Sequence, residues 1–330
     1  MGRIDFTSIS RDGLAWLESA AFQRERWLLH AFSTRRGGAS AKPAAGLNLG
    51  FTGRDTRARV ETNRRRFLRA LGARGYSLAS LRQIHSAHVF YVTREASGEL
   101  KYRPSGLPRG AAVPDGPPAG DALVTDQPGI LLTVRVADCL PVLLADPGHR
   151  VVAAVHAGWR GALARVISKT AGEMRRLFGS DPRKCLAALG PSIRACCYEV
   201  GEEVVETFAG RFARAEIFFR RAAPLTAALE DRYPLLFLSA RPPGHEPARR
   251  RVAFLDLVAV AREELLDAGF LPRRIHVADF CTACRTDLFF SHRKEGQDTG
   301  RLMGVMGIRP EARQGRSARG GRRVLHARQA

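Results

Sequence analysis

Apolar residues are concentrated in the centre of the chain, where three short runs rich in β-branched residues follow one another. The runs span 130–136, 141–145 and 151–156, and the turn residues Asp146-Pro147-Gly148 separate the last two. Short runs that are apolar at nearly every position are typical of strands buried on both faces. A helix over 161–178 and a strand over 186–189 are predicted to follow them.

Shorter apolar patterns on both sides of this centre predict further strands and amphipathic helices. Strands are predicted over 27–32, 81–93 and 275–277, and helices over 56–71, from about 201, and over 255–268. The stretch 97–120 is dense in Gly and Pro, and we interpret it as a long surface loop inside a domain. Together the patterns predict an α/β protein with a mixed sheet.

The length and composition fit a chain that folds without disulfides. With 330 residues and 45% hydrophobic content, it can bury a substantial core in one large domain or two modest ones. Six cysteines are too few for a disulfide framework, so reduced thiols are expected. No apolar run is long enough to cross a membrane and no secretory signal is recognisable, so we expect a soluble, cytoplasmic protein with no membrane partner.

The formal net charge of +21 raises the question of nucleic-acid binding. Seven arginines against one glutamate over 309–330 supply +6, which leaves +15 spread along the rest of the chain. The charge is not accompanied by an aromatic-studded basic motif or a zinc-finger spacing. We therefore expect a solvated basic surface that attracts small anions rather than nucleic acid, and a disordered tail over 309–330. A nucleic-acid-associated protein remains the non-enzyme hypothesis, and it predicts salt-dependent binding that is lost on truncation at Arg309.

Three residues stand where predicted strands meet polar or Gly-rich turns, and they form a candidate metal site. Cys139 follows a buried strand, His156 ends the next one, and His85 lies in another strand-like segment. A catalytic zinc site uses three protein ligands drawn from thiolate, imidazole and carboxylate. A scattered cysteine and two histidines are, taken alone, more often structural.

The sequence around these residues resembles the YfiH-type family, long called the multicopper polyphenol oxidase or laccase-domain family and now regarded as purine nucleoside phosphorylases. The matches appear in order as Thr34-Arg35-Arg36-Gly37-Gly38, Gly46-Leu47-Asn48-Leu49-Gly50, Asn63-Arg64, Gln83-Ile84-His85, Gly120-Asp121-Ala122-Leu123-Val124-Thr125, Ala137-Asp138-Cys139-Leu140-Pro141-Val142, His156-Ala157-Gly158-Trp159-Arg160-Gly161, Leu189-Gly190-Pro191-Ser192-Ile193, Cys197-Tyr198-Glu199-Val200, Cys281-Thr282 and Phe290-Ser291-His292-Arg293. They extend from about Leu29 to Ile308, so the resemblance covers nearly all of the chain.

The resemblance implies one compact α/β domain over 1–308, with layered mixed β-sheets flanked by helices. It implies that His85, Cys139 and His156 bind zinc. The implied activities are phosphorolysis of adenosine, guanosine, inosine and methylthioadenosine, and deamination of adenosine. Copper, the metal of the older name, stays open, because two imidazoles and a thiolate do not choose between zinc and copper. The expected partners are purine nucleosides and inorganic phosphate, and neither the preferred purine nor the oligomeric state is predicted.

Each activity assigns roles to particular residues. Deamination would use the metal as a Lewis acid that activates water for attack on purine C6. Asp138 is the candidate for proton transfer or for orienting a ligand, and a turn-stabilising carboxylate is an equal alternative. Phosphorolysis needs an anion clamp, for which Arg64 is the first candidate, with Arg35, Asn48 and Arg160 as further contacts.

Other residues of possible chemical importance carry weaker signals. Cys281 and Cys284 form a lone C-x-x-C pair, for which we favour a buried or substrate-wall role over a metal or redox role. His88 would point to the opposite side of a strand from His85, so it is not expected to be a ligand. His292 lies in a matched motif and suggests packing or substrate contact. Ser86 stands where the family usually has glycine, and this departure could alter substrate preference.

The same residues permit a second enzyme hypothesis. Cys139 could be a nucleophile with His156 as its base, in an amide hydrolase that edits peptidoglycan precursors, a role attributed to some relatives of the family. Such a pair needs no metal, so metal content separates the two hypotheses.

Overall fold

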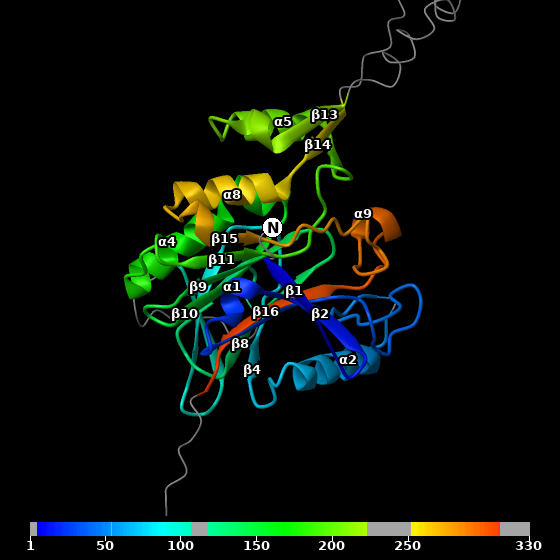
Figure 1. Ribbon diagram of the computed structural model, residues 1–330, viewed down its shortest axis with the longest axis vertical. Coiled ribbons are helices and arrows are strands. Elements are labelled where there is room, and N and C mark those ends of the chain that lie inside the picture. The colour runs from blue at the N-terminus through cyan, green and yellow to red at the C-terminus, as the bar shows by residue number, and fades with distance from the viewer. Residues whose placement is uncertain (1–4, 54, 107–117, 223–251, 311–330) are drawn as a thin grey trace, which may run out of the picture.

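Two mixed β-sheets lie face to face in the centre of the molecule, with helices on both outer sides (Figure 1). The computed structural model describes residues 5–53, 55–106, 118–222 and 252–310. The strands are β1 (Phe6–Arg11), β2 (Leu14–Ser19), β3 (Leu28–Ser33), β4 (Ser77–Ala79), β5 (Val89–Arg94), β6 (Leu100–Pro104), β7 (Ala122–Thr125), β8 (Ile130–Val136), β9 (Leu140–Asp146), β10 (Val151–Ala157), β11 (Leu186–Leu189), β12 (Glu199–Val200), β13 (Phe219–Ala222), β14 (Val252–Leu255), β15 (Ile275–Val277) and β16 (Leu302–Ile308). The helices are α1 (Ala20–Gln23), α2 (Arg57–Ala70), α3 (Trp159–Leu163), α4 (Val166–Phe178), α5 (Glu202–Ala209), α8 (Leu257–Asp267) and α9 (His292–Glu295), with 3-10 turns η1 (Ala215–Phe218) and η2 (Pro272–Arg274).

The strand order explains how distant parts of the chain meet. One sheet has the order β1-β2-β3-β16-β8-β4, and the other has the order β15-β11-β9-β10-β7-β5-β6. The last described strand, β16, lies between β3 and β8, so a C-terminal segment joins the two parts of the first sheet. A small third sheet, β12-β14-β13, lies beside α5 at the top of Figure 1.

Three apolar clusters hold four layers together. One lies between the two sheets, one between the seven-stranded sheet and α4 with α8, and one between the six-stranded sheet and α2. In β9, for example, Leu143 belongs to the cluster between the sheets, and Leu144 belongs to the cluster under the helices. The central strands are therefore buried on both faces, as their nearly continuous apolar runs predict.

Most predicted elements agree with the structure. The strands predicted over 27–32, 130–136, 141–145, 151–156, 186–189 and 275–277 correspond to β3, β8, β9, β10, β11 and β15. The helix predicted over 56–71 is α2, and it begins after Thr56, whose side chain accepts a hydrogen bond from the backbone N–H of Arg59. The fold class is confirmed: it is α/β, with layered mixed sheets flanked by helices.

Four predicted elements are wrong in part. The helix over 161–178 is divided into α3 and α4 at Arg165, which has a left-handed φ of 58°. The strand over 81–93 begins only at Val89, since the residues before it form a loop. The loop over 97–120 contains β6, which extends a hairpin from β5.

The fourth element, the helix over 255–268, starts later than predicted, because Asp256 accepts hydrogen bonds from Val258 and Ala259 and caps α8.

The prediction of a disordered tail over 309–330 falls almost entirely on residues 311–330, which lie outside the described residues. Among the helices described, none has the length and apolar character needed to span a bilayer.

Candidate metal and substrate site

The three predicted ligands meet where the chain passes from one sheet to the other. Cys139 lies in the turn between β8 of the six-stranded sheet and β9 of the seven-stranded sheet. β10 runs antiparallel to β9, with His156 opposite Pro141, so His156 reaches the same end of the sheet. His85 comes from the loop before β5. The side chain of Gln83 anchors this loop through two hydrogen bonds with the backbone of Arg135 in β8.

The ligand atoms of these residues are close enough to share one metal ion. All lie within 4.8 Å of one another, and the distance from Cys139 Sγ to His85 Nε2 is 3.7 Å. A tetrahedral zinc ion with ordinary bond lengths separates a sulfur and a nitrogen ligand by about 3.6 Å. The two imidazole rings meet edge to face, with centroids 5.0 Å apart. The structure thus brings together the three residues that the sequence indicates.

A buried carboxylate, Asp121, fixes both histidines. Asp121 is fully buried and accepts a hydrogen bond of 2.8 Å from His156 Nδ1. It also accepts hydrogen bonds from the backbone N–H groups of His85 and Ser86 and from the Ser86 hydroxyl. With its Nδ1–H directed at Asp121, His156 presents Nε2 to the ligand cluster. Ser86 therefore takes part in the support of the site through its side chain as well as its backbone.

The backbone is shaped tightly around the ligands. His85 and Asp138 are in the left-handed region, with φ of 59° and 88°, a conformation that is uncommon for residues other than glycine. Gly158 packs directly against the ligands, since a Cβ at this position would lie 2.7 Å from His85 Cδ2 and 3.1 Å from Cys139 Sγ. Any larger residue in place of Gly158 would therefore clash with His85 and Cys139.

Asp138 connects the ligand turn to two later segments of the chain. Its carboxylate accepts hydrogen bonds of 2.6 Å from the Thr282 hydroxyl and 2.6 Å from the backbone N–H of Arg293. Its backbone carbonyl accepts a hydrogen bond from the N–H of Ile193. Asp138 is only 7% exposed, and both of its carboxylate oxygens have partners within the chain.

The opposite charges of Cys139 and His156 stabilise each other. Burial alone would raise the pKa of the Cys139 thiol, but the positive charge of His156 and hydrogen bonds with both histidines lower it to about 6. Burial alone would lower the pKa of His156, but the Cys139 charge and the Asp121 hydrogen bond raise it to about 9. Cys139 is therefore available as a thiolate at neutral pH.

A cavity of about 400 Å³ opens over the ligands and is rich in cationic side chains. Its lining includes all three ligands and is completed by Gly50, Phe51, Arg82, Gln83, Arg135, Val136, Ala137, His292 and Arg301. Arg135 and Arg301 line the same cavity, and burial, followed by the charge of Arg301, lowers the pKa of Arg135. Neither Arg135 nor Arg301 forms an ion pair with a carboxylate in the described part of the chain.

Arg64, the first candidate for an anion clamp, is not itself on the cavity lining but lies beside residues that are. Its Nε donates a hydrogen bond of 2.8 Å to the Leu49 carbonyl, and its guanidinium lies 4.4 Å from the centre of the Phe51 ring. Burial, and then the charge of Arg135, lower the pKa of Arg64 to about 10. Arg64 is thus adjacent to both Phe51 and Arg135 of the cavity.

The structure does not place Arg35, Asn48 or Arg160 on the cavity lining. Arg35 forms an ion pair of 2.7 Å with Glu295, and Asn48 is fully buried and supports the backbone of Gly50 and Arg301. Arg160 is exposed, and its guanidinium lies over the Trp159 ring. Arg35 and Asn48 therefore support the residues around the cavity rather than contact a substrate directly.

Of the remaining candidate residues, only His292 lies on the cavity lining. His292 lines the cavity, whereas His88 is exposed in the loop before β5 and lies outside the group of converging ligands. Since this loop is not a strand, the alternation argument used for His88 does not apply. Cys281 and Cys284 lie in a different cluster of side chains, together with Cys196 and Cys197.

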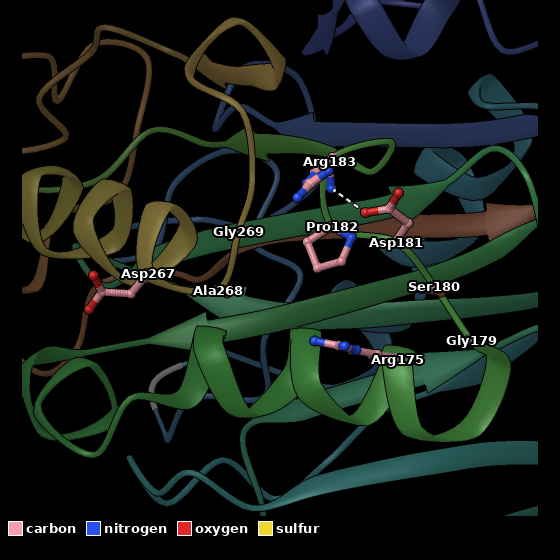
Figure 2. A pocket seen from close by; sticks show the side chains of 9 residues that line it. All are labelled: Arg175, Gly179, Ser180, Asp181, Pro182, Arg183, Asp267, Ala268 and Gly269. Atoms are coloured by element: carbon pink, nitrogen blue, oxygen red, sulfur yellow. Dashed lines mark hydrogen bonds between the residues drawn. The ribbon is translucent and has the colours of Figure 1, made fainter.

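A second cavity, of about 520 Å³, lies at the C-terminal ends of α4 and α8 (Figure 2). Its lining includes Arg175 and Asp267, and the backbone N–H of Arg183 donates a hydrogen bond to Asp181 there (Figure 2). It contains none of the predicted site residues.

Sequence reasoning missed the roles of Asp121, Arg135 and Arg301. Asp121 lies in a matched motif, Gly120-Asp121-Ala122, and a carboxylate at the start of a buried strand was the available signal. Arg135 is the one charged residue within the apolar run 130–136, which was a signal as well. Nothing in the local sequence distinguishes Arg301 from the other arginines of this chain.

Comparisons with known proteins show which family the chain is similar to. The family model described as multi-copper polyphenol oxidoreductase laccase matches residues 29–309. A purine nucleoside phosphorylase of Deinococcus radiodurans is 35% identical over 282 residues, which cover 84% of this chain and 88% of the relative. Adenosine deaminase RL5, from an unknown prokaryotic organism, is 32% identical over 86% of this chain and 96% of its own length. The crystal structure of the Bacillus licheniformis hypothetical protein YfiH superposes with a TM-score of 0.73 at 26% identity, covering 93% of this chain and all of that one.

Proposed function

Because the chain belongs to the family described as multi-copper polyphenol oxidoreductase laccase, we propose that it is a metal-dependent enzyme that cleaves purine nucleosides with phosphate and deaminates adenosine. Its similarity to relatives named purine nucleoside phosphorylase and adenosine deaminase supports this proposal. The observation that carries it is the convergence of His85, Cys139 and His156 at the floor of a cavity lined by arginines.

The donor set fits a divalent metal, and zinc is the metal we propose. Two imidazole nitrogens and a thiolate satisfy three positions of a tetrahedral zinc ion, and a catalytic site keeps the fourth for water or substrate. The support from Asp121 to His156 is the outer hydrogen bond that ligating histidines usually have. When bound, the metal supplies Lewis acidity for the reaction at the purine. Copper would use the same ligands, so the metal content of the purified enzyme decides between them.

Arg64, Arg135 and Arg301 form the phosphate clamp in this proposal. Guanidinium groups bind phosphate oxygens in pairs, and arginines that have no carboxylate partner among the described residues favour an anion in the space between them. In phosphorolysis, a phosphate oxygen attacks C1′ of the ribose while the bond from C1′ to the purine nitrogen breaks. The clamp holds the attacking oxygen, and it replaces Arg35, Asn48 and Arg160 as the set of direct contacts.

Phe51 offers a surface for the purine. Phe51 is 48% exposed although it is a large apolar residue, and it lines the cavity beside Arg64. An aromatic ring in this position stacks on a purine base with little cost in conformational entropy. His292, on the cavity wall, is available to hydrogen-bond the nucleoside.

Asp138 and Asp121 act as positioning residues in this proposal. Asp138 has both oxygens engaged within the chain, which favours the turn-stabilising alternative over proton transfer. We also place the enzyme in the cytoplasm, because Cys139 must stay a free thiolate and a reducing compartment maintains it.

The experiment that tests the proposal is incubation of the purified protein with adenosine and with inosine, each with and without phosphate, followed by chromatography of the products. Phosphate-dependent release of free base and conversion of adenosine to inosine are the expected results. Cys139→Ala is expected to abolish both activities. Cys185→Ala, at a buried cysteine that is not on the cavity lining, is the matched control and should retain them.

One observation favours the amide hydrolase as a second candidate. The Cys139 thiolate beside a positively charged His156 is also the arrangement of a cysteine nucleophile and its base. A protein that is inert towards every nucleoside, cleaves amides of peptidoglycan precursors and keeps that activity in a chelator would establish the hydrolase and overturn the phosphorylase.

A further inference from the structure

Four cysteines outside the proposed active site form a compact cluster. Cys196 and Cys197 lie in the turn between β11 and β12, and Cys281 and Cys284 lie in the segment between β15 and α9. All four sulfurs lie within 4.8 Å of one another. The sequence offers only a lone C-x-x-C pair, which is weak evidence alone, but the fold supplies the second pair from almost ninety residues away.

The distances within the cluster match a metal site better than a set of unrelated thiols. Cys284 Sγ lies 3.5 Å from Cys196 Sγ and 3.4 Å from Cys197 Sγ. Ordinary zinc–sulfur bonds of about 2.3 Å in a tetrahedron separate the sulfurs by about 3.8 Å, whereas a disulfide brings them to about 2.05 Å. The observed spacing therefore needs only small side-chain adjustments to surround one ion.

The backbone already holds the two halves of the cluster in place. The backbone of Ser192 pairs with that of Cys281, and the N–H of Thr282 donates a hydrogen bond of 3.0 Å to the Ser192 carbonyl. Cys281 is buried, while Cys196 and Cys284 are exposed, so an ion can enter from solvent and still be anchored on a buried sulfur. A site with this preformed geometry loses little entropy on binding.

We propose that Cys196, Cys197, Cys281 and Cys284 bind a second divalent metal ion, of the thiolate-preferring kind such as zinc, as a structural site. Four protein ligands close the coordination sphere, which distinguishes this site from the three-ligand active site. On binding, the coordinated thiols release their protons to solvent, and no oxidant is needed.

The second site would stabilise the wall of the first. Asp138, next to the ligand Cys139, accepts hydrogen bonds from Ile193, Thr282 and Arg293. Ile193 and Thr282 lie on the two segments that the cysteine cluster joins, and Arg293 lies in α9, which follows the second of them. A metal clasp on those segments would therefore hold the Asp138 turn without touching the substrate.

The test measures metal stoichiometry and cobalt spectra on the full chain purified with reductant and zinc. Two metal ions per chain are expected for the wild type, and one each for His85→Ala and for the double variant Cys281→Ser with Cys284→Ser. After cobalt replaces zinc, the His85→Ala protein should keep a strong sulfur-to-cobalt charge-transfer band typical of four thiolates. The double variant should retain only the weaker band of a single thiolate.

Two controls keep the result interpretable if the double variant folds poorly. The single variant Cys196→Ser removes one exposed ligand and should weaken the four-thiolate band, whereas Cys185→Ala should leave both the stoichiometry and the spectrum unchanged. One metal per chain in the folded wild type, lost in His85→Ala, would overturn the proposal. So would an intact mass two or four daltons below that of the thiol form, which would identify the cluster as one or two disulfides.

Discussion

The Asp121 carboxylate joins two histidines that come from different elements. It accepts the His156 Nδ1–H and also the backbone N–H of His85, so one buried charge sets the orientation of one imidazole and the backbone position of the other. Burial alone would raise the pKa of Asp121, but hydrogen bonds from His156 and Ser86 lower it to about 2. Asp121 is thus ionised throughout the working pH range, and its charge is part of the proposed metal site.

Replacement of Asp121 by Asn keeps the shape of the side chain but removes this charge. We expect Asp121→Asn to weaken metal binding by about 10- to 100-fold, as is usual when the outer partner of a ligating histidine is lost. Competition with a chromogenic chelator measures the affinity. Asp146→Asn, which alters a buried carboxylate bonded to His149 at the far end of β9, is the matched control. Unchanged affinity in Asp121→Asn would show that Asp121 has no role in metal binding.

Arg135 provides a residue-scale test that separates the two proposed activities. Phosphorolysis needs the anion clamp and deamination does not, so Arg135→Gln should raise KM for phosphate by about 10- to 100-fold, the loss of one charge-assisted hydrogen bond. The kcat/KM for adenosine deamination should change far less. Arg59→Gln, on the exposed face of α2, is the control. An equal loss in both activities would mean that Arg135 supports the fold of the cavity rather than phosphate.

At the scale of elements, the start of α4 depends on a residue of α8. Arg165 precedes α4 in a left-handed conformation and provides no side-chain cap. Glu264 of α8 instead accepts hydrogen bonds from the backbone N–H groups of Ile167 and Ser168. The Glu264 side chain is buried, and its burial, against these hydrogen bonds, raises its pKa to about 8. The contact therefore binds two helices together through a carboxyl group that holds its proton unusually well.

This contact makes stability depend on pH. The folded pKa of Glu264 lies above the ordinary value of 4.5, so between about pH 4.5 and 8 the folded protein keeps a proton that the unfolded chain releases. The free energy of unfolding should fall as pH rises through this window, by at most about 1.4 kcal/mol per pH unit, and the contribution should level off above pH 8. Glu264→Gln should flatten the curve measured by urea unfolding. Glu263→Gln, on the same helix, should keep the wild-type slope. Parallel curves for Glu264→Gln and the wild type would contradict the argument.

The elements that the sequence predicts well are those whose pattern or boundaries are set by residues within or next to the segment. The runs that became β8, β9 and β10 are apolar at nearly every position, and α2 has a capping Thr56 and a terminal Gly72, so local residues determine them. The break at Arg165 was not predictable, because the compensating group, Glu264, is almost a hundred residues away.

The residues of the candidate site also differ in whether local sequence or pairing between distant segments determines their positions. His85, Cys139 and His156 stand in recognisable motifs. By contrast, the contribution of Arg301 depends on β16 pairing with β8 and carrying the preceding residues to the cavity. The cysteine cluster depends in the same way on the pairing of Ser192 with Cys281. The position of Arg301 and the cysteine cluster both depend on pairing between distant segments, which cannot be predicted from the local sequence.

At the scale of the whole molecule, the seven-stranded sheet serves two cores at once. Leu143 and Leu144 are neighbours in β9 and both are fully buried, yet one packs between the sheets and the other packs under α4 and α8. The proposed active site lies at the end of this strand, next to Pro141 and Cys139. The position of the ligands therefore depends on both layers that hold β9.

Truncation of each leucine measures the two cores separately. Leu143→Ala and Leu144→Ala should each lower the free energy of unfolding by about 2–5 kcal/mol, because each removes buried methyl groups and leaves a cavity. Leu78→Ala, at a position 36% exposed in β4, should cost much less. Since the two side chains point to opposite faces of one sheet, the double variant should equal the sum of the single changes within about 0.5 kcal/mol. Urea unfolding provides all four values. A double variant that departs from the sum by more than 1 kcal/mol would mean that β9 shifts when one core is emptied, and metal affinity at Cys139 should then fall in the single variants too.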